Sequence, residues 1–359
     1  MQFNDSYRGL RILVTGHTGF KGSWLTNWLK LLGADVSGIS LLPNGNPNHW
    51  ELLEMDIEEY FVDIRDYELL SHKIEQIRPQ VIFHLAAQSL VRQSYTDPLG
   101  TWETNVMGTA NVLEISRKIK DLFAVVVITT DKCYENKEWV WGYRESDALG
   151  GHDPYSASKA ACENLVQSFR KSFFSGGRTL IASARAGNVI GGGDWSDNRL
   201  IPDLVRSMQT NVPVNIRSPN ATRPWQHVLD CLSGYLLLGQ RLLEGDQFFA
   251  RAWNFGPSDD ATRSVISVVE ALHSNLPSIK WSVENEEHPH EAGMLQLDST
   301  MARKFLGWCS AWPFDQGLMA TASWYQQFYE KNQVATQSQI KNYIECASSQ
   351  KINWTQGAA

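Results

Sequence analysis

The stretch that decides the fold reads Arg11-Ile-Leu-Val-Thr15-Gly16-His17-Thr18-Gly19-Phe20-Lys21-Gly22. Its first five residues predict a buried β-strand, and from Phe20 apolar side chains recur at helical spacing until Gly33, where the helix should end. The glycines between strand and helix are spaced G-x-x-G-x-x-G. Such glycines allow a tight turn and let the backbone approach a pyrophosphate, while the helix N-terminus supplies N–H donors and a partial positive charge. This stretch therefore predicts a dinucleotide-binding strand–loop–helix unit.

Further strands are expected where short, mostly β-branched apolar runs alternate with amphipathic stretches, at residues 36–40, 81–85, 125–129 and 180–186. Strands separated by helices predict a parallel sheet that is covered on both faces and binds ligands beyond the carboxyl ends of its strands. After about Gly187, glycine, proline and asparagine become frequent and the alternation weakens. We therefore expect an α/β fold, a Rossmann-like doubly wound parallel sheet with a smaller mixed α/β domain for the substrate.

The domain boundaries are expected to interleave along the chain. The sheet domain should take residues 1–187 and about 228–253, because the helical stretch 228–243 is expected to pack back on the sheet. The smaller domain should take residues 188–227 and 254–335. Residues 336–359 form a polar C-terminal tail, for which we expect either a peripheral helix or a poorly ordered segment.

Composition and charge narrow the class of protein. The 359 residues are 43% apolar and carry a net charge of −7, which argues against nucleic acid or an anionic membrane as the main partner. The apolar runs, such as residues 124–128, are too short to span a bilayer, and the N-terminus lacks the apolar stretch of a secretion signal. Five scattered cysteines without a C-x-x-C pattern are typical of free thiols in a reducing cytoplasm, where we expect this protein.

The second expected strand bears on the identity of the dinucleotide. An acidic residue at the end of that strand usually bonds the adenosine ribose, but Asp35 precedes the strand and Ser40, at its end, is neutral. No Lys or Arg lies between Lys30 and Arg65 to hold a 2′-phosphate. These observations favour NAD over NADP.

A Tyr-x-x-x-Lys pair, Tyr155 and Lys159, follows a buried strand that ends in Thr129-Thr130. Residues four apart on a helix share one face. A neighbouring ammonium favours the phenolate and lowers the pKa of a tyrosine, which can then remove a hydroxyl proton while hydride leaves the same carbon. The pair is weak as a motif alone, and its position after a dinucleotide loop gives it weight.

Together these residues resemble the extended branch of the short-chain dehydrogenase/reductases, over roughly residues 10–330. Within that branch the chain is similar to the nucleotide-sugar 4,6-dehydratases, and most to those that act on CDP-glucose, through Thr130-Asp131-Lys132 and residues 185–195, 223–225 and 288–293. The motifs shared with the wider branch are Gly16/Gly19/Gly22, Asp63-Ile64, His84-Leu-Ala-Ala-Gln88, Thr104-Asn105, Thr130, Tyr155 and Lys159.

The resemblance implies the residues of two binding sites. NAD would contact Gly16, His17, Gly19, Phe20, Lys21, Gly22, Ser40, Asp63, Ile64, Leu85, Ala86, Ala87, Gln88, Thr104, Tyr155 and Lys159. The nucleotide-sugar substrate, CDP-glucose, would be held by Asn188, Arg199, Leu200, Arg223 and His290. Arginine suits this role because its planar fork matches phosphate oxygens.

The resemblance also implies a reaction, catalysed by Thr130, Asp131, Lys132, Tyr155 and Lys159. Tyr155 removes the C4 hydroxyl proton while hydride passes to NAD, water leaves across C5 and C6, and hydride returns to C6. Asp131 protonates the departing hydroxyl. The implied product is CDP-4-keto-6-deoxy-glucose, an intermediate of dideoxysugar or deoxysugar synthesis for bacterial surface polysaccharide, the lipopolysaccharide O-antigen.

The base that takes the C5 proton is left open. Many related dehydratases have Glu directly after the Asp, whereas this chain has Lys132, as the CDP-glucose branch does. Lys132 can act as the base only when neutral, or it can stabilise the enolate while another residue, such as Glu135, takes the proton.

The glycine loop also departs from the pattern of its relatives at His17 and Lys21. Related proteins often have a small residue at the first position and an apolar one at the second. The larger side chains could crowd the pyrophosphate and weaken NAD binding, whereas Lys21 could equally attract the phosphates.

Three alternatives are weighed against this reading. A nucleotide-sugar 4-epimerase needs the same Tyr and Lys but not Asp131, a dehydratase could act on another nucleotide-glucose, and a non-catalytic NAD-binding protein could share the fold. No metal is expected at His288 and His290, because metal sites usually need three or four convergent ligands. A homo-oligomer, dimer or tetramer, is expected from the resemblance alone.

Overall fold

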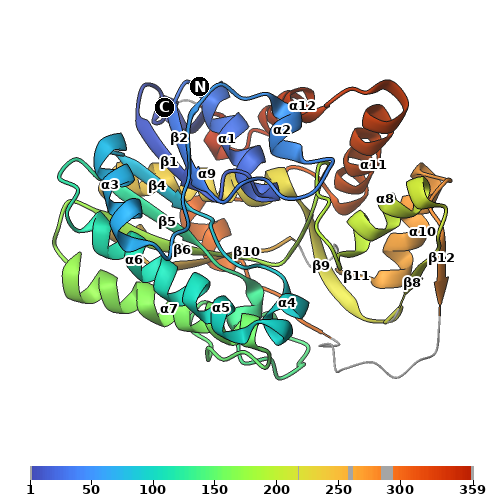
Figure 1. Cartoon of the computed structure of the whole chain (residues 1–359), viewed down its shortest axis with the longest axis horizontal. Helices are drawn as coiled ribbons and strands as arrows, with labels where there is room; N and C mark the ends of the chain where they lie inside the picture. Colours follow the sequence, from blue (N-terminus) through green and yellow to red (C-terminus); the bar gives the residue numbers. More distant parts are fainter. Residues whose placement is uncertain (1, 217, 258–261, 284–293, 357–359) are drawn as a thin grey trace.

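The computed structural model describes residues 2–216, 218–257, 262–283 and 294–356. Its centre is a seven-stranded parallel sheet in the order β10-β6-β5-β4-β1-β2-β3 (Figure 1). The strands are β1 Arg11–Thr15, β2 Asp35–Ser40, β3 Glu58–Phe61, β4 Val81–His84, β5 Ala124–Ile128, β6 Leu180–Ala186 and β10 Ala252–Phe255. The strand order reverses beside β1, as in doubly wound Rossmann sheets, so the predicted fold class is confirmed.

Two strands of this sheet, β3 and β10, escape prediction from sequence. β3 reads Glu-Glu-Tyr-Phe and is mostly exposed at the sheet edge, so it lacks the apolar run that marks a buried strand. β10 occupies the opposite edge and reads Ala-Trp-Asn-Phe, without the β-branched residues that mark the predicted strands. The five strands expected from sequence are all present, and their ends differ from the expected ones by at most one residue.

Alternating strand residues face two helical layers. Leu13 and Ile82 join the core beneath α3 (Tyr67–Ile77), α6 (Gly108–Ser116) and α7 (Pro154–Phe173). Ile12 and Phe83 join the core on the other face, beneath α1 (Phe20–Leu31) and α9 (Val228–Leu243). The helix over residues 228–243 therefore returns to the sheet as predicted, where it contacts β5 and β6.

A smaller lobe lies beside the carboxyl ends of the sheet strands (Figure 1). It holds a three-stranded sheet, β11-β9-β7, and a parallel pair, β8 with β12. Its elements are β7 Asn188–Ile190, α8 Leu200–Thr210, β8 Val214–Ile216, β9 Thr222–His227, β11 Thr262–Ser264, α10 Val265–Asn275 and β12 Trp281–Val283. The lobe mixes strands and helices, as the sequence predicts.

The C-terminal segment is part of the main core. After α11 (Phe314–Lys331), α12 (Thr336–Ser349) packs against α1, and Tyr343 is fully buried. The Trp354 ring stacks on Phe3 with ring centroids 4.9 Å apart. Of the two expectations for the tail, the helix is present, but it is buried rather than peripheral.

None of the helices in the described ranges is both long enough and apolar enough to cross a membrane.

Candidate active site

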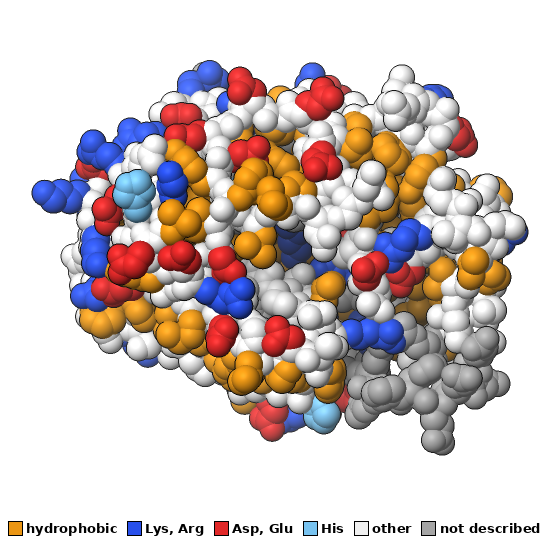
Figure 2. Space-filling model, in the orientation of Figure 1, with side chains coloured by type: hydrophobic (Ala, Val, Ile, Leu, Met, Phe, Trp, Pro, Cys, Tyr) orange, Lys and Arg blue, Asp and Glu red, His pale blue; other side chains and the backbone are white. Residues whose placement is uncertain are grey.

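The predicted site residues gather where the sheet order reverses. The glycine loop follows β1, residues 85–88 follow β4, and Thr130 follows β5, so all three lie at the carboxyl edge of the sheet. This edge is where doubly wound sheets bind their ligands. Figure 2 shows a hollow between the large sheet and the smaller lobe, with Lys or Arg side chains inside it.

The backbone of the glycine loop leaves no room for side chains at two of its three glycines. Gly16 has φ +75° and its N–H donates to Ile39 O at 2.7 Å. A Cβ on Gly16 would lie 2.7 Å from Ala86 N, and one on Gly22 would lie 2.0 Å from Gly16 O. Gly19 caps α1 without a side chain, so the helix N-terminus keeps N–H donors for an anion. The loop therefore fits a dinucleotide pyrophosphate.

The side chain of His17 is packed among other residues, and the expectation that His17 contacts or crowds the cofactor stays a prediction. The residue is fully buried, and its Nε2 lies 3.0 Å from Glu59 Oε2. Its ring packs edge-on against Trp50, and a Cβ on Gly38 would lie 2.5 Å from it. Burial lowers the pKa of His17. The ring thus fills space beneath β2 instead of facing the loop opening.

Lys21 points toward α9 and the residues that are predicted to be catalytic. Its Nζ lies 3.4 Å from the Tyr235 hydroxyl on α9. The ammonium also lowers the pKa of Lys159, after the larger effect of burial. The structure therefore brings two lysines to the floor of the site, and a role for Lys21 toward phosphates stays a prediction. Phe20 opens α1 and lies against Gly191 of the smaller lobe.

The residues predicted to meet the adenosine lie at the ends of β2 and β3. Ser40 Oγ hydrogen-bonds Thr18 Oγ1 at 2.7 Å. Asp63 forms an ion pair with Arg65 at 2.6 Å, and this contact lowers the pKa of Asp63. Ile64 is buried, in a position where a Cβ on Gly108 would lie 2.5 Å from its Cδ1.

The loop after β4 is fixed by its own hydrogen bonds. Leu85 N donates to Thr15 O at 3.0 Å and Ala86 N to Thr15 Oγ1 at 3.2 Å, which leads the chain past Ala87 to Gln88. The Gln88 amide donates to Thr101 Oγ1 at 2.9 Å, so this side chain shapes its own loop. Thr104 lies in the π-helical turn Glu103–Met107 and is half-buried.

Tyr155 and Lys159 share one face of α7 and converge on the end of β5. The helix begins with Pro154 at its first position, and Asp153 caps it by accepting from Ser156 N. The Tyr155 hydroxyl hydrogen-bonds Thr130. Lys159 Nζ is 3.5 Å from Ile128 O, a distance at the upper limit for a hydrogen bond.

Burial governs both ionisable groups. It raises the pKa of Tyr155, and the two main influences that lower this pKa come from Thr130 and Arg199. Burial also lowers the pKa of Lys159. The sequence predicted a phenol made acidic by Lys159, whereas the structure assigns that influence chiefly to the Thr130 hydroxyl and the Arg199 guanidinium.

Asp131 is buried with one oxygen unpaired. Its Oδ1 accepts from Thr130 Oγ1 at 3.0 Å and lies 3.6 Å from Lys132 Nζ, while Oδ2 has no hydrogen-bond partner within the described ranges. A Cβ on Gly187 would lie 2.9 Å from Oδ2. Lys132 is about one-third exposed, at 34%. The carboxyl group thus has one oxygen without a partner among the described residues, while the Lys132 ammonium lies near the other oxygen.

Glu135, the alternative base, points elsewhere. Its side chain is 58% exposed and its Oε2 lies 3.8 Å from Lys137 Nζ. This exposed ion pair disfavours Glu135 as the group that takes a proton inside the site.

The smaller lobe contributes the predicted substrate ligands. Asn188 begins β7, Arg223 lies on the neighbouring β9, and Leu200 begins α8 after its N-cap, Arg199. Arg199 Nη1 pairs with Asp194 at 3.0 Å and its Nη2 lies 3.3 Å from Ser89 Oγ.

His290 lies outside the described residues, as does His288, so the predictions about substrate binding and metal there stay predictions.

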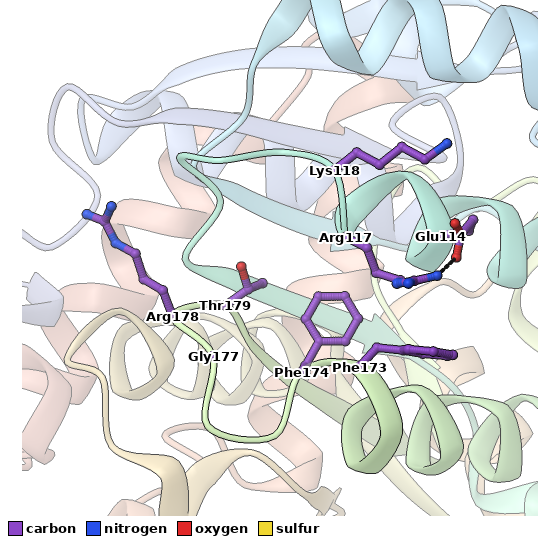
Figure 3. A pocket seen from close by; sticks show the side chains of 8 residues that line it. All are labelled: Glu114, Arg117, Lys118, Phe173, Phe174, Gly177, Arg178 and Thr179. Atoms are coloured by element: carbon purple, nitrogen blue, oxygen red, sulfur yellow. Dashed lines mark hydrogen bonds and ion pairs between the residues drawn. The ribbon is translucent and has the colours of Figure 1, made fainter.

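A cavity of about 360 Å³ opens at the opposite edge of the sheet (Figure 3). Arg117 crosses it to pair with Glu114, and Thr179 precedes the first residue of β6. None of the predicted site residues lines it. This cavity therefore belongs to the amino edge of the strands and is separate from the candidate site.

Sequence reasoning missed a buried ion pair behind the site. Glu163 and Arg185 have side chains 2% and 3% exposed and lie 2.7 Å apart. The signal for it was present, because Arg185 interrupts the otherwise uncharged strand Leu-Ile-Ala-Ser-Ala-Arg-Ala and Glu163 follows Lys159 by four residues. Asp194, which holds Arg199, was also missed as a site residue.

Comparison with known proteins agrees with the motifs. Residues 13–321 match the model of the family described as GDP-mannose 4,6 dehydratase. The chain is 43% identical over 352 residues to CDP-glucose 4,6-dehydratase of Salmonella typhimurium, covering 95% of this chain and 98% of that protein. It is 26% identical to a probable dTDP-glucose 4,6-dehydratase of Sinorhizobium fredii, covering 88% of this chain and 93% of that protein.

Solved structures show the same fold. A UDP-glucose 4-epimerase of Thermotoga maritima superposes with a TM-score of 0.77 at 24% identity, covering 88% of this chain and 98% of that one. A dTDP-glucose 4,6-dehydratase of Streptomyces venezuelae gives 0.75 at 24% identity, covering 88% and 97%. The family match and the 43% identity over nearly the whole length place the chain in the GDP-mannose 4,6 dehydratase family.

Proposed function

We propose that this protein is a CDP-glucose 4,6-dehydratase that binds NAD and converts CDP-D-glucose to CDP-4-keto-6-deoxy-D-glucose and water. The observation that carries the proposal is the buried Asp131 carboxyl group, whose Oδ2 lies against Gly187 and whose charge acts on Tyr155, at the same edge of the sheet as the glycine loop. Oxidation of a sugar hydroxyl requires the tyrosine, whereas loss of water also requires an acid. The 43% identity with the Salmonella enzyme supports CDP-glucose as the substrate.

Oxidation at C4 depends on the chain's control of one proton. The bound nicotinamide supplies the hydride acceptor for C4 and the hydride donor for C6. Tyr155 accepts the C4 hydroxyl proton. The Thr130 hydroxyl, which otherwise donates its one hydrogen to Asp131 Oδ1, turns it to the phenolate oxygen and stabilises that oxygen against the burial that opposes its ionisation. Arg199 adds a positive charge near the same oxygen.

Elimination depends on the turn that follows β5. A ketone at C4 makes the C5 proton acidic, and Asp131 Oδ2 donates a proton to the departing C6 hydroxyl. Lys132 lies 3.6 Å from Asp131 Oδ1, where it either takes the C5 proton when neutral or stabilises the enolate when charged. Glu135, paired with Lys137, is the weaker candidate for the base.

The nucleotide sugar is proposed to bridge the sheet and the smaller lobe. Asn188, Arg199, Leu200 and Arg223 all lie on the smaller lobe beside the carboxyl edge, and arginine forks suit the two phosphates. The pairing of Arg199 with Asp194 fixes its guanidinium toward Tyr155.

We also infer a homo-oligomer. Apolar side chains stand exposed on the helices α4 (Val91–Thr96) and α5 (Pro98–Trp102) and on the turn that follows, with Tyr95 at 60%, Leu99 at 75% and Met107 at 57%. A second copy of the chain is the proposed partner of this face. A molar mass of one chain by light scattering would contradict it.

The proposed setting is the cytoplasm, where the product would feed dideoxysugar synthesis for lipopolysaccharide O-antigen. The net charge of −7 and the dispersed cysteines are compatible with this setting.

A substrate panel tests the proposal. Purified protein with NAD is incubated with the CDP, dTDP, UDP and GDP derivatives of glucose. The mass of each product is measured by mass spectrometry, and its absorbance is recorded after addition of alkali. CDP-glucose should lose one water and give the alkali-absorbing ketone, with no net build-up of reduced nicotinamide. CDP-galactose as the product would instead identify an epimerase, and no product from any sugar would overturn the proposal.

A further inference from the structure

The ion pair of Glu163 and Arg185 has both partners buried, alone among the ion pairs in the described part of the chain. Removing two charges from water has a large desolvation cost, and an apolar pair of similar volume is often at least as stable. Stabilisation of the fold alone is therefore a weak explanation for a charged pair at this place. The contacts of the pair indicate a role in positioning the neighbouring turn.

Glu163 holds the chain just before the catalytic turn. Its Oε1 accepts a hydrogen bond from Thr129 Oγ1 at 2.5 Å, and its Oε2 accepts from Ser183 Oγ at 2.8 Å. Thr129 directly precedes Thr130 and the turn Asp131–Cys133. Both carboxylate oxygens are thus occupied, one by the end of β5 and one by the neighbouring strand β6.

Arg185 holds the chain just after the same turn. Its Nη2 donates to Glu163 at 2.7 Å, and its Nη1 donates to the Tyr134 hydroxyl at 2.6 Å and to Glu145 O at 3.2 Å. Tyr134 directly follows the turn and passes its own hydrogen bond to Asn254 Oδ1 at 2.7 Å. The ion pair is therefore hydrogen-bonded to the residue before the turn and to the residue after it.

Helix α7 connects the hydrogen bonds of this ion pair with the residue that acts in the oxidation step. Tyr155, Lys159 and Glu163 are spaced by four residues and lie on one face of the helix. Each contacts the end of β5 or the residues directly after it: Tyr155 with Thr130, Lys159 with Ile128 O, and Glu163 with Thr129. One rigid face thus carries the phenol that acts at C4 and the carboxylate that fixes the turn acting at C5 and C6.

We propose that Glu163 and Arg185 are positioning residues that keep the Asp131–Lys132 turn in register with Tyr155, so that elimination keeps pace with C4 oxidation on one bound sugar. Neither side chain is exposed enough to reach the substrate. The inference rests on the proposed dehydratase function. It predicts a change in the ratio of two steps, because small displacements of a catalytic group slow its own step most.

The direct test is Glu163→Gln, which removes the charge and keeps the shape. In single turnovers, near-ultraviolet absorbance of reduced nicotinamide reports C4 oxidation, and product mass reports elimination. We expect elimination to slow roughly 10- to 100-fold while oxidation changes only a few-fold, so that reduced nicotinamide builds up. KM for the nucleotide sugar should change little, because its proposed ligands lie on other elements. Arg185→Lys should act in the same direction.

A milder matched pair covers the case in which Glu163→Gln does not fold. Thr129→Val and Ser183→Ala each remove one hydroxyl that donates to Glu163, but only Thr129 adjoins the turn. Thr129→Val should raise the ratio of oxidation to elimination, and Ser183→Ala should leave it near the wild-type value. Thermal unfolding of both variants reports any loss of stability separately.

The outcomes are distinct. A wild-type ratio in Glu163→Gln, Arg185→Lys and Thr129→Val, whatever their melting temperatures, overturns the positioning role and leaves the proposed function intact. An equal change in Thr129→Val and Ser183→Ala shows a merely structural role and also overturns it. Wild-type protein that dehydrates no nucleotide-glucose overturns the proposed function and this inference with it.

Discussion

At the scale of single residues, the site separates two tasks that share one sugar. Tyr155 is buried and hydrogen-bonded to Thr130. Burial raises the pKa of its hydroxyl, which opposes loss of the proton. Asp131 lies on the other side of Thr130 and keeps one oxygen unpaired. An unpaired buried carboxyl oxygen is costly in a folded protein, and such sites are commonly functional.

Variants at these two residues should fail at different steps. Tyr155→Phe should keep the fold and lower kcat by roughly 10²- to 10⁴-fold, because C4 oxidation lacks its proton acceptor. Asp131→Asn should still oxidise C4 and reduce bound nicotinamide, but release little dehydrated product. Stopped-flow absorbance with product mass separates the two cases. Near-normal turnover of Tyr155→Phe would refute the role of the phenol.

At the scale of elements, the glycine loop is the segment in which the path of the backbone requires glycine. Gly22 lies within α1, where a Cβ would be 2.0 Å from Gly16 O, so any side chain must displace the loop. The loop then loses the close approach that a pyrophosphate needs.

Gly22→Ala should therefore weaken NAD binding by roughly tenfold or more, about 1.4 kcal/mol. Gly177→Ala is the matched control, because its nearest contact would be an ordinary 3.4 Å to Phe174 O. Titration calorimetry measures the binding, and unfolding without NAD shows whether the fold itself has suffered. Equal affinities in the two variants would contradict the assignment of the loop.

Elements with a strong local pattern could be predicted from the sequence. β6 is a continuous buried run and α9 is apolar through most of its length, and both have the expected bounds. β3 is exposed and β10 has no β-branched residue, so neither carries that pattern. The burial of the His17 side chain could not be predicted, because spacing says that a residue belongs to a loop but not which way its side chain turns. The Glu163–Arg185 pair joins α7 to β6. Each partner is visible in the sequence only as an isolated charged residue, so their pairing could not be predicted.

At the scale of the whole molecule, one buried carboxyl group joins the C-terminal segment to helix α9 by hydrogen bonds. Asp230 on α9 accepts hydrogen bonds from Ala311 N and from the Tyr343 hydroxyl, each at 2.7 Å. Its second oxygen, Oδ2, has no hydrogen-bond partner in the part of the chain that the structure describes. Burial raises the pKa of Asp230 to about 7.

This raised pKa predicts how stability depends on pH. In the unfolded chain an aspartate titrates near about 3.9, so the folded state favours neutral Asp230. Its contribution is full below about pH 4 and is lost as the pH rises through about 7. Relative to Asp230→Asn, the wild-type free energy of unfolding should therefore fall by about 4 kcal/mol across that window. Urea unfolding of both proteins at the two ends measures this, and a constant difference would contradict it.

The stacking of Trp354 on Phe3 has a consequence for how the polypeptide is made. The two rings close one edge of the main core, and the marked ends of the chain lie near each other in Figure 1. A ribosome exposes the first ring long before it has synthesised the second. The apolar surface around Phe3 therefore stays exposed to solvent during synthesis. This edge of the core can pack fully only after residue 354 has left the exit tunnel.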